Sequence, residues 1–196
     1  MEETIDELRA LFTRFDLYEE GYARFTSDKR KLEWLAVRAL LKEMLGDEKE
    51  IAYLPSGKPY LADGSGWISF SHTQGYVAVA FCPFEEVGID IERYGDKVKR
   101  VAHKFIRKDE EPSIRNAEDE VNALLVHWSA KETLYKLIGL EGVDFLEDLR
   151  ILPCTPLEGG SVKGYVYRPE REGMYYVDFM TTPDYVLTYA SATLPK

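Results

Sequence analysis

Hydrophobic residues recur at helical spacing in three parts of this chain. Near the N-terminus, the apolar side chains of residues 5–15 fall on one face of a helix. A second helix is predicted after Thr26 and Ser27, whose hydroxyls are suited to cap it, and it ends at Gly46. The longest predicted helix spans residues 118–139. Long helices are therefore expected in both halves of the chain.

Shorter apolar runs, alternating or continuous, predict strands between and after these helices. The first two flank a turn expected at residues 71–75, and the third begins after Pro83. The C-terminal part of the chain holds three more, with glycines and prolines between them. The six predicted strands are residues 67–70, 76–81, 87–92, 162–167, 175–180 and 185–190.

The two halves of the chain are similar to each other. Residues 34–42 align with residues 128–136 at a constant offset of 94, and both segments begin with tryptophan and end with lysine. Residues 67–77 align with residues 176–186 at an offset of 109. The order of both matches predicts an α+β fold of two similar lobes with pseudo-twofold symmetry, each a small antiparallel sheet packed with a long helix.

At 196 residues the chain is long enough for two small lobes that share a core. We expect an N-terminal lobe at residues 1–85 and a C-terminal lobe at residues 86–196. A cleft between two such lobes is a favoured place for a ligand to bind.

Composition narrows the function classes. The formal net charge of -10 argues against broad nucleic-acid binding, which depends on Lys and Arg that neutralise phosphates. The two cysteines, Cys82 and Cys154, show no metal-ligand spacing, which favours a reduced intracellular protein. The acidic N-terminus does not have the pattern of a signal peptide, and no apolar run is long enough to span a bilayer. We therefore expect a cytoplasmic protein without a membrane or nucleic-acid partner.

Four residues in two elements could carry phosphoryl chemistry. Asp90 and Glu92 are two apart on a predicted strand and share a face. Glu132 and Lys136 are four apart on the longest helix and share a face as well. Three carboxylates and a lysine brought together would hold a hard divalent cation beside a phosphate. A Mg²⁺-dependent transferase of the phosphoryl type is the leading hypothesis.

Each of these features alone is more common in a structural or solvated role. An isolated pair such as Asp90 and Glu92 is usually a solvated strand face, and a Glu–Lys pair on a helix usually gives a few tenths of a kcal/mol of stability. However, Trp128, one turn before Glu132, indicates that this helix face is partly buried, and a buried acid needs a partner or a metal. The other candidates with common structural or solvated roles are His72, Lys58, Arg30 and Arg38.

Three motifs in a fixed order make the chain resemble the two-lobed type of 4′-phosphopantetheinyl transferases, which activate carrier proteins. A G-[IV]-D-x-E strand corresponds to residues 88–92, and a W-S-x-K-E-x-x-x-K helix corresponds to residues 128–136. A G-K-P element and a following S-H-[ST] element correspond to residues 57–59 and 71–73. This resemblance extends over residues 26–139. Beyond it the chain matches only as a tail rich in strands.

The resemblance implies an activity and a ligand set. The 4′-phosphopantetheine group of coenzyme A would pass to a serine of an apo acyl or peptidyl carrier protein, with release of adenosine 3′,5′-bisphosphate. It implies a monomer, with Mg²⁺ as the cation and Mn²⁺ as its alternative. The implied metal ligands are Asp90, Glu92 and Glu132; the implied catalytic residues are Glu132 and Lys136; and the implied coenzyme A contacts are Arg30, Arg38, Lys58, Ser71, His72 and Lys136.

Two further segments bear on this resemblance. The basic segment at residues 93–108, from Arg93 to Lys108, has seven cations against one acid and offers complementary charge to an acidic carrier protein. A solvated helix face explains the same segment equally well. The family has an acidic position a little further on, and the sequence leaves open whether Asp109, Glu110 or Glu111 corresponds to it.

Two alternative functions remain open at this stage. A Mg²⁺-dependent nuclease uses similar acids, although the net negative charge weighs against it. A non-catalytic interaction module with two α+β lobes would need no cation. The sequence does not identify the carrier protein or the group that accepts the serine proton.

Overall fold

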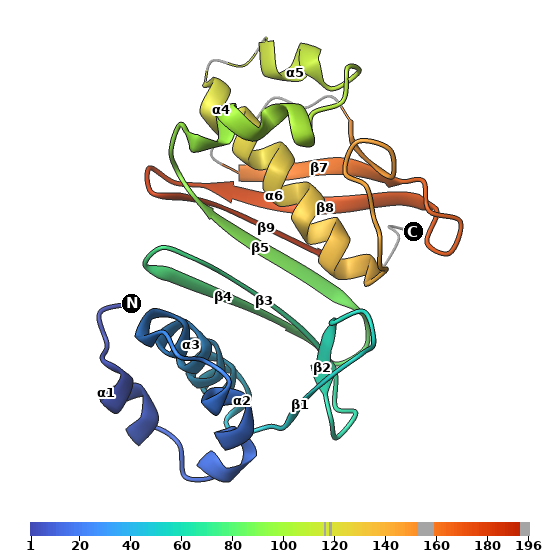
Figure 1. Cartoon of the computed structure of the whole chain (residues 1–196). Coiled ribbons are helices and arrows are strands. Elements are labelled where there is room, and N and C mark those ends of the chain that lie inside the picture. Colours follow the sequence, from blue (N-terminus) through green and yellow to red (C-terminus); the bar gives the residue numbers. More distant parts are fainter. Residues whose placement is uncertain (116, 118, 153–158, 193–196) are drawn as a thin grey trace.

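Two antiparallel sheets, each covered by helices, divide the chain into two lobes (Figure 1). The computed structural model describes residues 1–115, 117, 119–152 and 159–192. The predicted α+β fold of two similar lobes is confirmed. The likeness of the halves is visible in the element order, because a long helix precedes a β-hairpin in each lobe.

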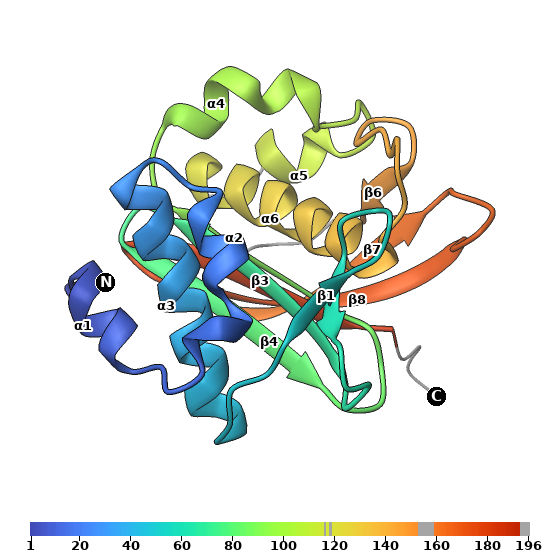
Figure 2. The same ribbon diagram turned by 60° about the horizontal axis from the view of Figure 1, so that its bottom comes forward.

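The N-terminal lobe places the long helix α3 (Asp28–Leu45) across its sheet, as Figure 2 shows. Leu35 and Ala36 of α3 pack with Leu8, Phe12 and Tyr18, which closes a small apolar core. The helix ends at Gly46, whose φ of 71° is the left-handed conformation favoured by glycine. The other elements of this lobe are α1 (Ile5–Ala10), η1 (Phe15–Leu17), α2 (Glu19–Ala23), β1 (Ile51–Tyr53), β2 (Pro59–Leu61), β3 (Trp67–Thr73) and β4 (Tyr76–Cys82).

The C-terminal lobe is built around α6 (Glu120–Ile138), which lies on the sheet of order β5-β9-β8-β7-β6. Its core is the largest in the described chain, and Ala130 and Leu134 of α6 are completely buried in it. Asp119 caps this helix by accepting the backbone N–H of Asn122 at 3.0 Å. The other elements are β5 (Val87–Arg93), α4 (Lys97–Val101), η2 (Ala102–Lys104), α5 (Glu111–Arg115), β6 (Leu149–Ile151), β7 (Gly159–Val166), β8 (Gly173–Thr181) and β9 (Tyr185–Ser191).

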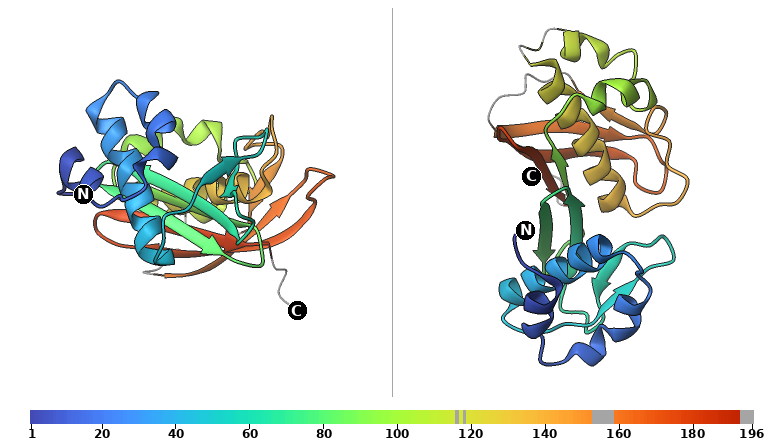
Figure 3. Two further views of the ribbon diagram at one scale, coloured as in Figure 1. Left: turned by 90° about the horizontal axis from the view of Figure 1, so that it is seen from below. Right: turned by 60° about the vertical axis from the view of Figure 1, so that its left-hand side comes forward.

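Strand β5 lies where the two lobes meet, beside β3 and β4 of the first sheet (Figure 3, right). The backbone N–H of Ile89 donates to Ser69 Oγ at 3.1 Å, which links β5 to β3. On one face of β5, Ile89 and Ile91 pack with Ala78 of β4. The lobes therefore share buried apolar surface, and residues of β3 and β5 are held in fixed relation to each other.

The structure corrects three local predictions. The turn expected at residues 71–75 is shorter, because β3 continues to Thr73 and Ser71 and His72 pair with β4. Ser27 occupies the cap position of α3, but its hydroxyl makes no capping bond. The first helix ends at Ala10 instead of continuing to Phe15. Of the two cysteines, Cys82 is partly buried and unpaired, and Cys154 lies outside the described residues.

One buried carboxylate ties the N-terminal helices to the end of α3. Glu48 accepts the backbone N–H groups of Thr13 at 2.8 Å and Arg14 at 3.0 Å, and it pairs with Lys42 at 2.8 Å. Burial alone would raise the pKa of Glu48, but Lys42 and the Thr13 and Arg14 donors outweigh it and lower the pKa to about 2. The ionised carboxylate therefore stabilises the folded state.

Replacing Glu48 with glutamine is expected to lower the free energy of unfolding by about 2 kcal/mol at pH 7. Because the folded pKa is depressed, this contribution is present above the ordinary pKa of 4.5 and is lost as the pH falls towards about 2. Urea unfolding at several pH values measures it. The exposed Glu43→Gln, a matched control on α3, should change stability by less than about 0.5 kcal/mol. A difference between Glu48→Gln and wild type that persisted at pH 2 would contradict the role given to Glu48.

Candidate active site

The acidic face of β5 is covered by helix α6. Gly88 makes this close approach possible, because a Cβ atom there would overlap the carbonyl oxygen of Thr133 and crowd Leu137. Asp90 and Glu92 follow Gly88 at alternate positions, so their side chains point at α6 and not into solvent. The solvated strand face that this pattern most often forms is therefore not what the structure shows: Asp90 is only 3% exposed.

Asp90 is held from both lobes. Its Oδ1 accepts Ser71 Oγ of β3 at 2.8 Å and Lys136 Nζ of α6 at 2.7 Å. Lys136 also donates to the carbonyl oxygen of Ile89 at 3.1 Å. The second oxygen, Oδ2, is buried and has no hydrogen-bond partner. A buried carboxylate oxygen without a donor indicates a place where a cation would be stabilised.

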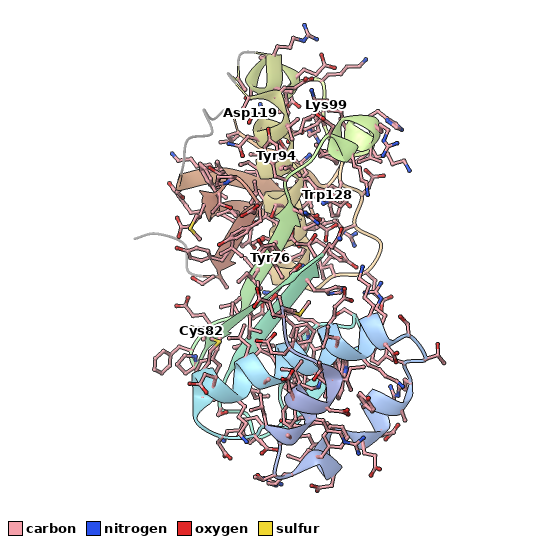
Figure 4. All side chains as sticks on the ribbon, turned by 90° about the vertical axis from the view of Figure 1, so that its left-hand side faces the viewer. Tyr76, Cys82, Tyr94, Lys99, Asp119 and Trp128 are labelled. Carbon is pink, nitrogen blue, oxygen red and sulfur yellow. The ribbon has the colours of Figure 1, made fainter. Side chains whose placement is uncertain are left out.

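Glu92 and Glu132 complete what we call the carboxylate cluster, which is Asp90, Glu92 and Glu132. Glu92 Oε1 accepts the indole N–H of Trp128 at 2.7 Å (Figure 4 labels Trp128). Burial, and then the charge of Asp90, raises the pKa of Glu92. Burial, with repulsion from Asp90 and Glu92, raises the pKa of Glu132 to about 7 even though Lys136 opposes the shift. The three acids are therefore close enough to repel one another.

A divalent cation fits the charge of this cluster. Three partly or fully buried carboxylates with one lysine leave excess negative charge, and hard cations take oxygen ligands of this kind. In the described chain, however, no three His, Cys, Asp or Glu side chains already converge in an arrangement that would hold a metal ion. Cation binding by Asp90, Glu92 and Glu132 therefore stays a prediction.

The N-terminal lobe contributes a second group of charged side chains, on α3 and β3. His72 Nε2 lies 2.5 Å from Arg30 Nη1 and 3.3 Å from Glu33 Oε2. Burial lowers the pKa of His72; Glu33 opposes this shift, and the charges of Arg30 and Lys136 add to it. Of the predicted coenzyme A contacts, Arg30, Ser71, His72 and Lys136 are thus gathered around the same junction between the lobes.

Lys58 and Arg38, the other two predicted coenzyme A contacts, bond to groups of the protein itself. The buried Lys58 ammonium donates to the carbonyl oxygen of Leu137 and pairs with Glu86 at 3.3 Å, so it ties the first sheet to the end of α6. Burial lowers the pKa of Lys58, and Glu86 opposes this shift. Arg38 stacks over Trp34 inside the N-terminal lobe. Burial lowers the pKa of Arg38 to about 10.

Two hollows open beside the junction. One, of about 240 Å³, lies between the lobes and is lined by Lys58, Ser69 and Lys136 among others. The other, of about 960 Å³, is lined by Lys29, Thr73 and much of the basic segment. Figure 4 labels two residues of that segment, Tyr94 and Lys99. Tyr94 donates a hydrogen bond to Asp119 and Lys99 pairs with Glu120, so the segment is held against the start of α6.

Of two buried acids near the site, the sequence named one only as one of three candidates and did not identify the other. Glu110, which is completely buried, pairs with Lys131 of α6 at 2.9 Å and accepts the backbone N–H groups of Arg107 and Ile151. It is the buried acid among the three candidates at residues 109–111. Glu33, a second buried acid, lies on α3. Its only sequence signal is its position two residues after the cationic run at residues 29–31 and next to Trp34.

With this geometry established, the comparisons with known proteins define the class. A model of the 4′-phosphopantetheinyl transferase superfamily matches residues 86–190, more than half of the chain. The chain belongs to this superfamily. Its matched part begins just before β5 and ends in β9, so it contains the carboxylate cluster.

Curated relatives of the chain bear the name 4′-phosphopantetheinyl transferase AcpT. The protein from Salmonella typhimurium is 31% identical over 115 residues, which is 56% of this chain and 60% of that protein. The protein from Escherichia coli O157:H7 is 41% identical over 64 residues, which is 32% of this chain and 33% of that protein. The chain thus matches less than two thirds of the length of each.

The helices of the described residues include none with the length and apolar character of a membrane span.

Proposed function

We propose that this protein transfers the 4′-phosphopantetheine group of coenzyme A to a serine of an apo acyl or peptidyl carrier protein, with Mg²⁺ or Mn²⁺ as cofactor. The observation that carries this proposal is the packing of Asp90, Glu92, Glu132 and Lys136 against one another at the junction of the lobes. Membership of the superfamily supports the reaction type.

The residues of the chain have separate tasks in this reaction. The serine oxygen of the carrier attacks the β-phosphorus of coenzyme A, and adenosine 3′,5′-bisphosphate leaves with the electrons of the broken phosphorus–oxygen bond. Asp90, Glu92 and Glu132 would hold the cation, which offsets the charge of the pyrophosphate when it is bound. Lys136, 25% exposed, can turn its ammonium group from Asp90 to a phosphate oxygen, while Glu132 accepts the serine proton.

Binding of the two substrates follows from the surroundings of the carboxylate cluster. Coenzyme A would lie in the cleft between residues 1–85 and 86–196, with Arg30, Ser71 and His72 beside its phosphates. The basic segment at residues 93–108, on the larger hollow, would attract an acidic carrier protein. Lys58 and Arg38 complete the proposed coenzyme A contacts; Lys58 also joins the lobes, and Arg38 also donates to the carbonyl oxygen of Trp34. Since one chain supplies every residue named, we propose a monomeric enzyme.

The experiment that tests this function is incubation with coenzyme A, Mg²⁺ and several apo carrier proteins, followed by mass spectrometry of the carriers. We expect the mass of one phosphopantetheine group to be added to one serine. Chelation of the cation should stop the transfer, and Mg²⁺ or Mn²⁺ should restore it. No mass gain on any carrier, together with Mg²⁺-dependent cleavage of a nucleic acid, would favour the nuclease. No mass gain and no activity that depends on a cation would favour the interaction module.

A further inference from the structure

Glu33 is a buried acid in a place where a binding site for phosphates would not be expected to have one. It lies on α3, and only 6% of its side chain is exposed. Arg30 Nη1 and His72 Nε2 are each 3.3 Å from Glu33 Oε2, and Lys29 Nζ is 3.8 Å from Oε1. The three basic side chains are far more exposed than the acid, which lies behind them. Glu33 must therefore have a role other than binding an anion.

The geometry around His72 Nε2 gives Glu33 a specific task. Arg30 Nη1, at 2.5 Å, and Glu33 Oε2, at 3.3 Å, both face this one nitrogen. A neutral imidazole with a lone pair on Nε2 accepts from Arg30, whereas an imidazole with a proton on Nε2 donates to Glu33. The nitrogen cannot do both, so the group has two alternative hydrogen-bonding arrangements.

Glu33 favours the second arrangement against the other charges nearby. Burial lowers the pKa of His72, and the cations Arg30 and Lys29 of α3 and Lys136 of α6 lower it further. Glu33 opposes them by raising it. When both ring nitrogens are protonated, the form that the charge of Glu33 favours, Nε2 donates to Glu33 and Arg30 loses the imidazole as its acceptor. Arg30 Nη1 keeps its 3.3 Å hydrogen bond to Glu33 Oε2, and the other N–H groups of the guanidinium can bind an anion. His72 is then cationic and partly exposed, while the balancing negative charge remains buried.

We propose that Glu33 is a positioning residue that holds His72 in the form that donates from Nε2, and so presents Arg30 and His72 together to a phosphate of coenzyme A. This inference rests on the proposed function. The phosphate can be the 3′-phosphate or the pyrophosphate, since both offer the same oxygen acceptors. Glu33 itself does not touch the substrate.

Calorimetric titration with coenzyme A tests the proposal through Glu33→Gln, which keeps the shape and removes the charge. We expect the Kd for coenzyme A to rise about tenfold, the equivalent of about 1.4 kcal/mol. With dephospho-coenzyme A, the same comparison separates the two sources: a smaller effect identifies the 3′-phosphate, and an equal effect identifies the pyrophosphate. Unchanged or tighter binding of coenzyme A by Glu33→Gln would overturn the proposal, since simple removal of a repelling acid predicts tighter binding.

Two controls separate positioning from a general effect on the fold. Glu43→Gln makes the same chemical change at an exposed position of α3 and should leave the Kd unchanged. In the background of His72→Gln, Glu33→Gln should add little to the loss, because the two residues act as a unit.

Nuclear magnetic resonance of the His72 ring nitrogens gives a readout without ligand. The midpoint of the His72 titration should move to lower pH in Glu33→Gln. An unchanged midpoint would contradict the role proposed for Glu33. If wild type failed to bind coenzyme A while this shift was present, the proposed function would fail and the coupling of Glu33 to His72 would stand.

Discussion

Glu132→Gln is expected to reduce phosphopantetheine transfer by about 10³-fold and to leave the fold intact. Glutamine keeps the size of the side chain but loses the negative charge, and it can neither hold a cation as well nor accept the serine proton. Because the side chain is only partly buried beside Asp90 and Glu92, removing its charge relieves repulsion in the apoprotein. Thermal stability should therefore be unchanged or slightly higher, while activity is lost.

The measurement is the initial rate of carrier modification by purified protein at saturating coenzyme A and Mg²⁺. Glu141→Gln, an exposed glutamate just beyond the end of α6, is the matched control and should retain the wild-type rate. Asp90→Asn should also abolish transfer, and it should cost stability as well, because Lys136 and Ser71 lose their charged acceptor. A Glu132→Gln protein that transferred at the wild-type rate would refute the assignment of the carboxylate cluster.

The longer elements of the fold could be predicted from the sequence because their patterns repeat several times. Helices α3 and α6 each span five turns, and strands β3, β4, β5, β8 and β9 each have seven or more residues. The repeat predicted two similar lobes, and the structure confirms them. By contrast, β1, β2 and β6 are three residues long, which is too short for a period to appear.

The candidate site was predictable only where the motif residues face each other. Spacing placed Asp90 and Glu92 on one face of a strand, and the structure shows that α6 covers this face. Spacing says nothing about how a lone lysine or arginine is used. Lys58 joins the lobes through Leu137 and Glu86, which are distant in sequence. Arg38 lies four residues after Trp34 on α3, so spacing places the two on one helix face, but only the structure shows that they stack.

Buried ion pairs are the part of this site that sequence reasoning cannot find. Glu110 and Lys131 are 21 residues apart, one in a loop and the other in a helix. No helical or strand periodicity relates the two positions, so no pattern predicts their contact. Lys131 is next to Glu132 in the family motif, yet its ammonium is buried against the backbone of two loops and not beside Asp90. A motif lysine beside a motif glutamate can thus serve the fold while its neighbour serves the reaction.

Lys131→Met is expected to destabilise the protein by about 3–5 kcal/mol, the usual cost of breaking a buried pair by removing one partner. The Lys131 ammonium is fully buried and donates to Glu110 Oε2 and to the carbonyl oxygens of Phe105 and Phe145. It therefore fastens two loops to α6. For a chain of this size, the loss corresponds to a fall in Tm of about 10 °C, measurable by circular dichroism.

The double variant Lys131→Met/Glu110→Gln distinguishes a broken pair from a general packing defect. Removing both charges eliminates the uncompensated buried carboxylate, so the double variant should be less destabilised than the sum of the two single variants. Lys108→Met, at an exposed position of the same loop as Glu110, should change stability by no more than about 0.5 kcal/mol. Additive losses in the double variant would show that the pair makes no net contribution. The loop at residues 105–110 would then be held by its other contacts, among them the bonds from Arg107 to the carbonyl oxygens of Leu146 and Glu147.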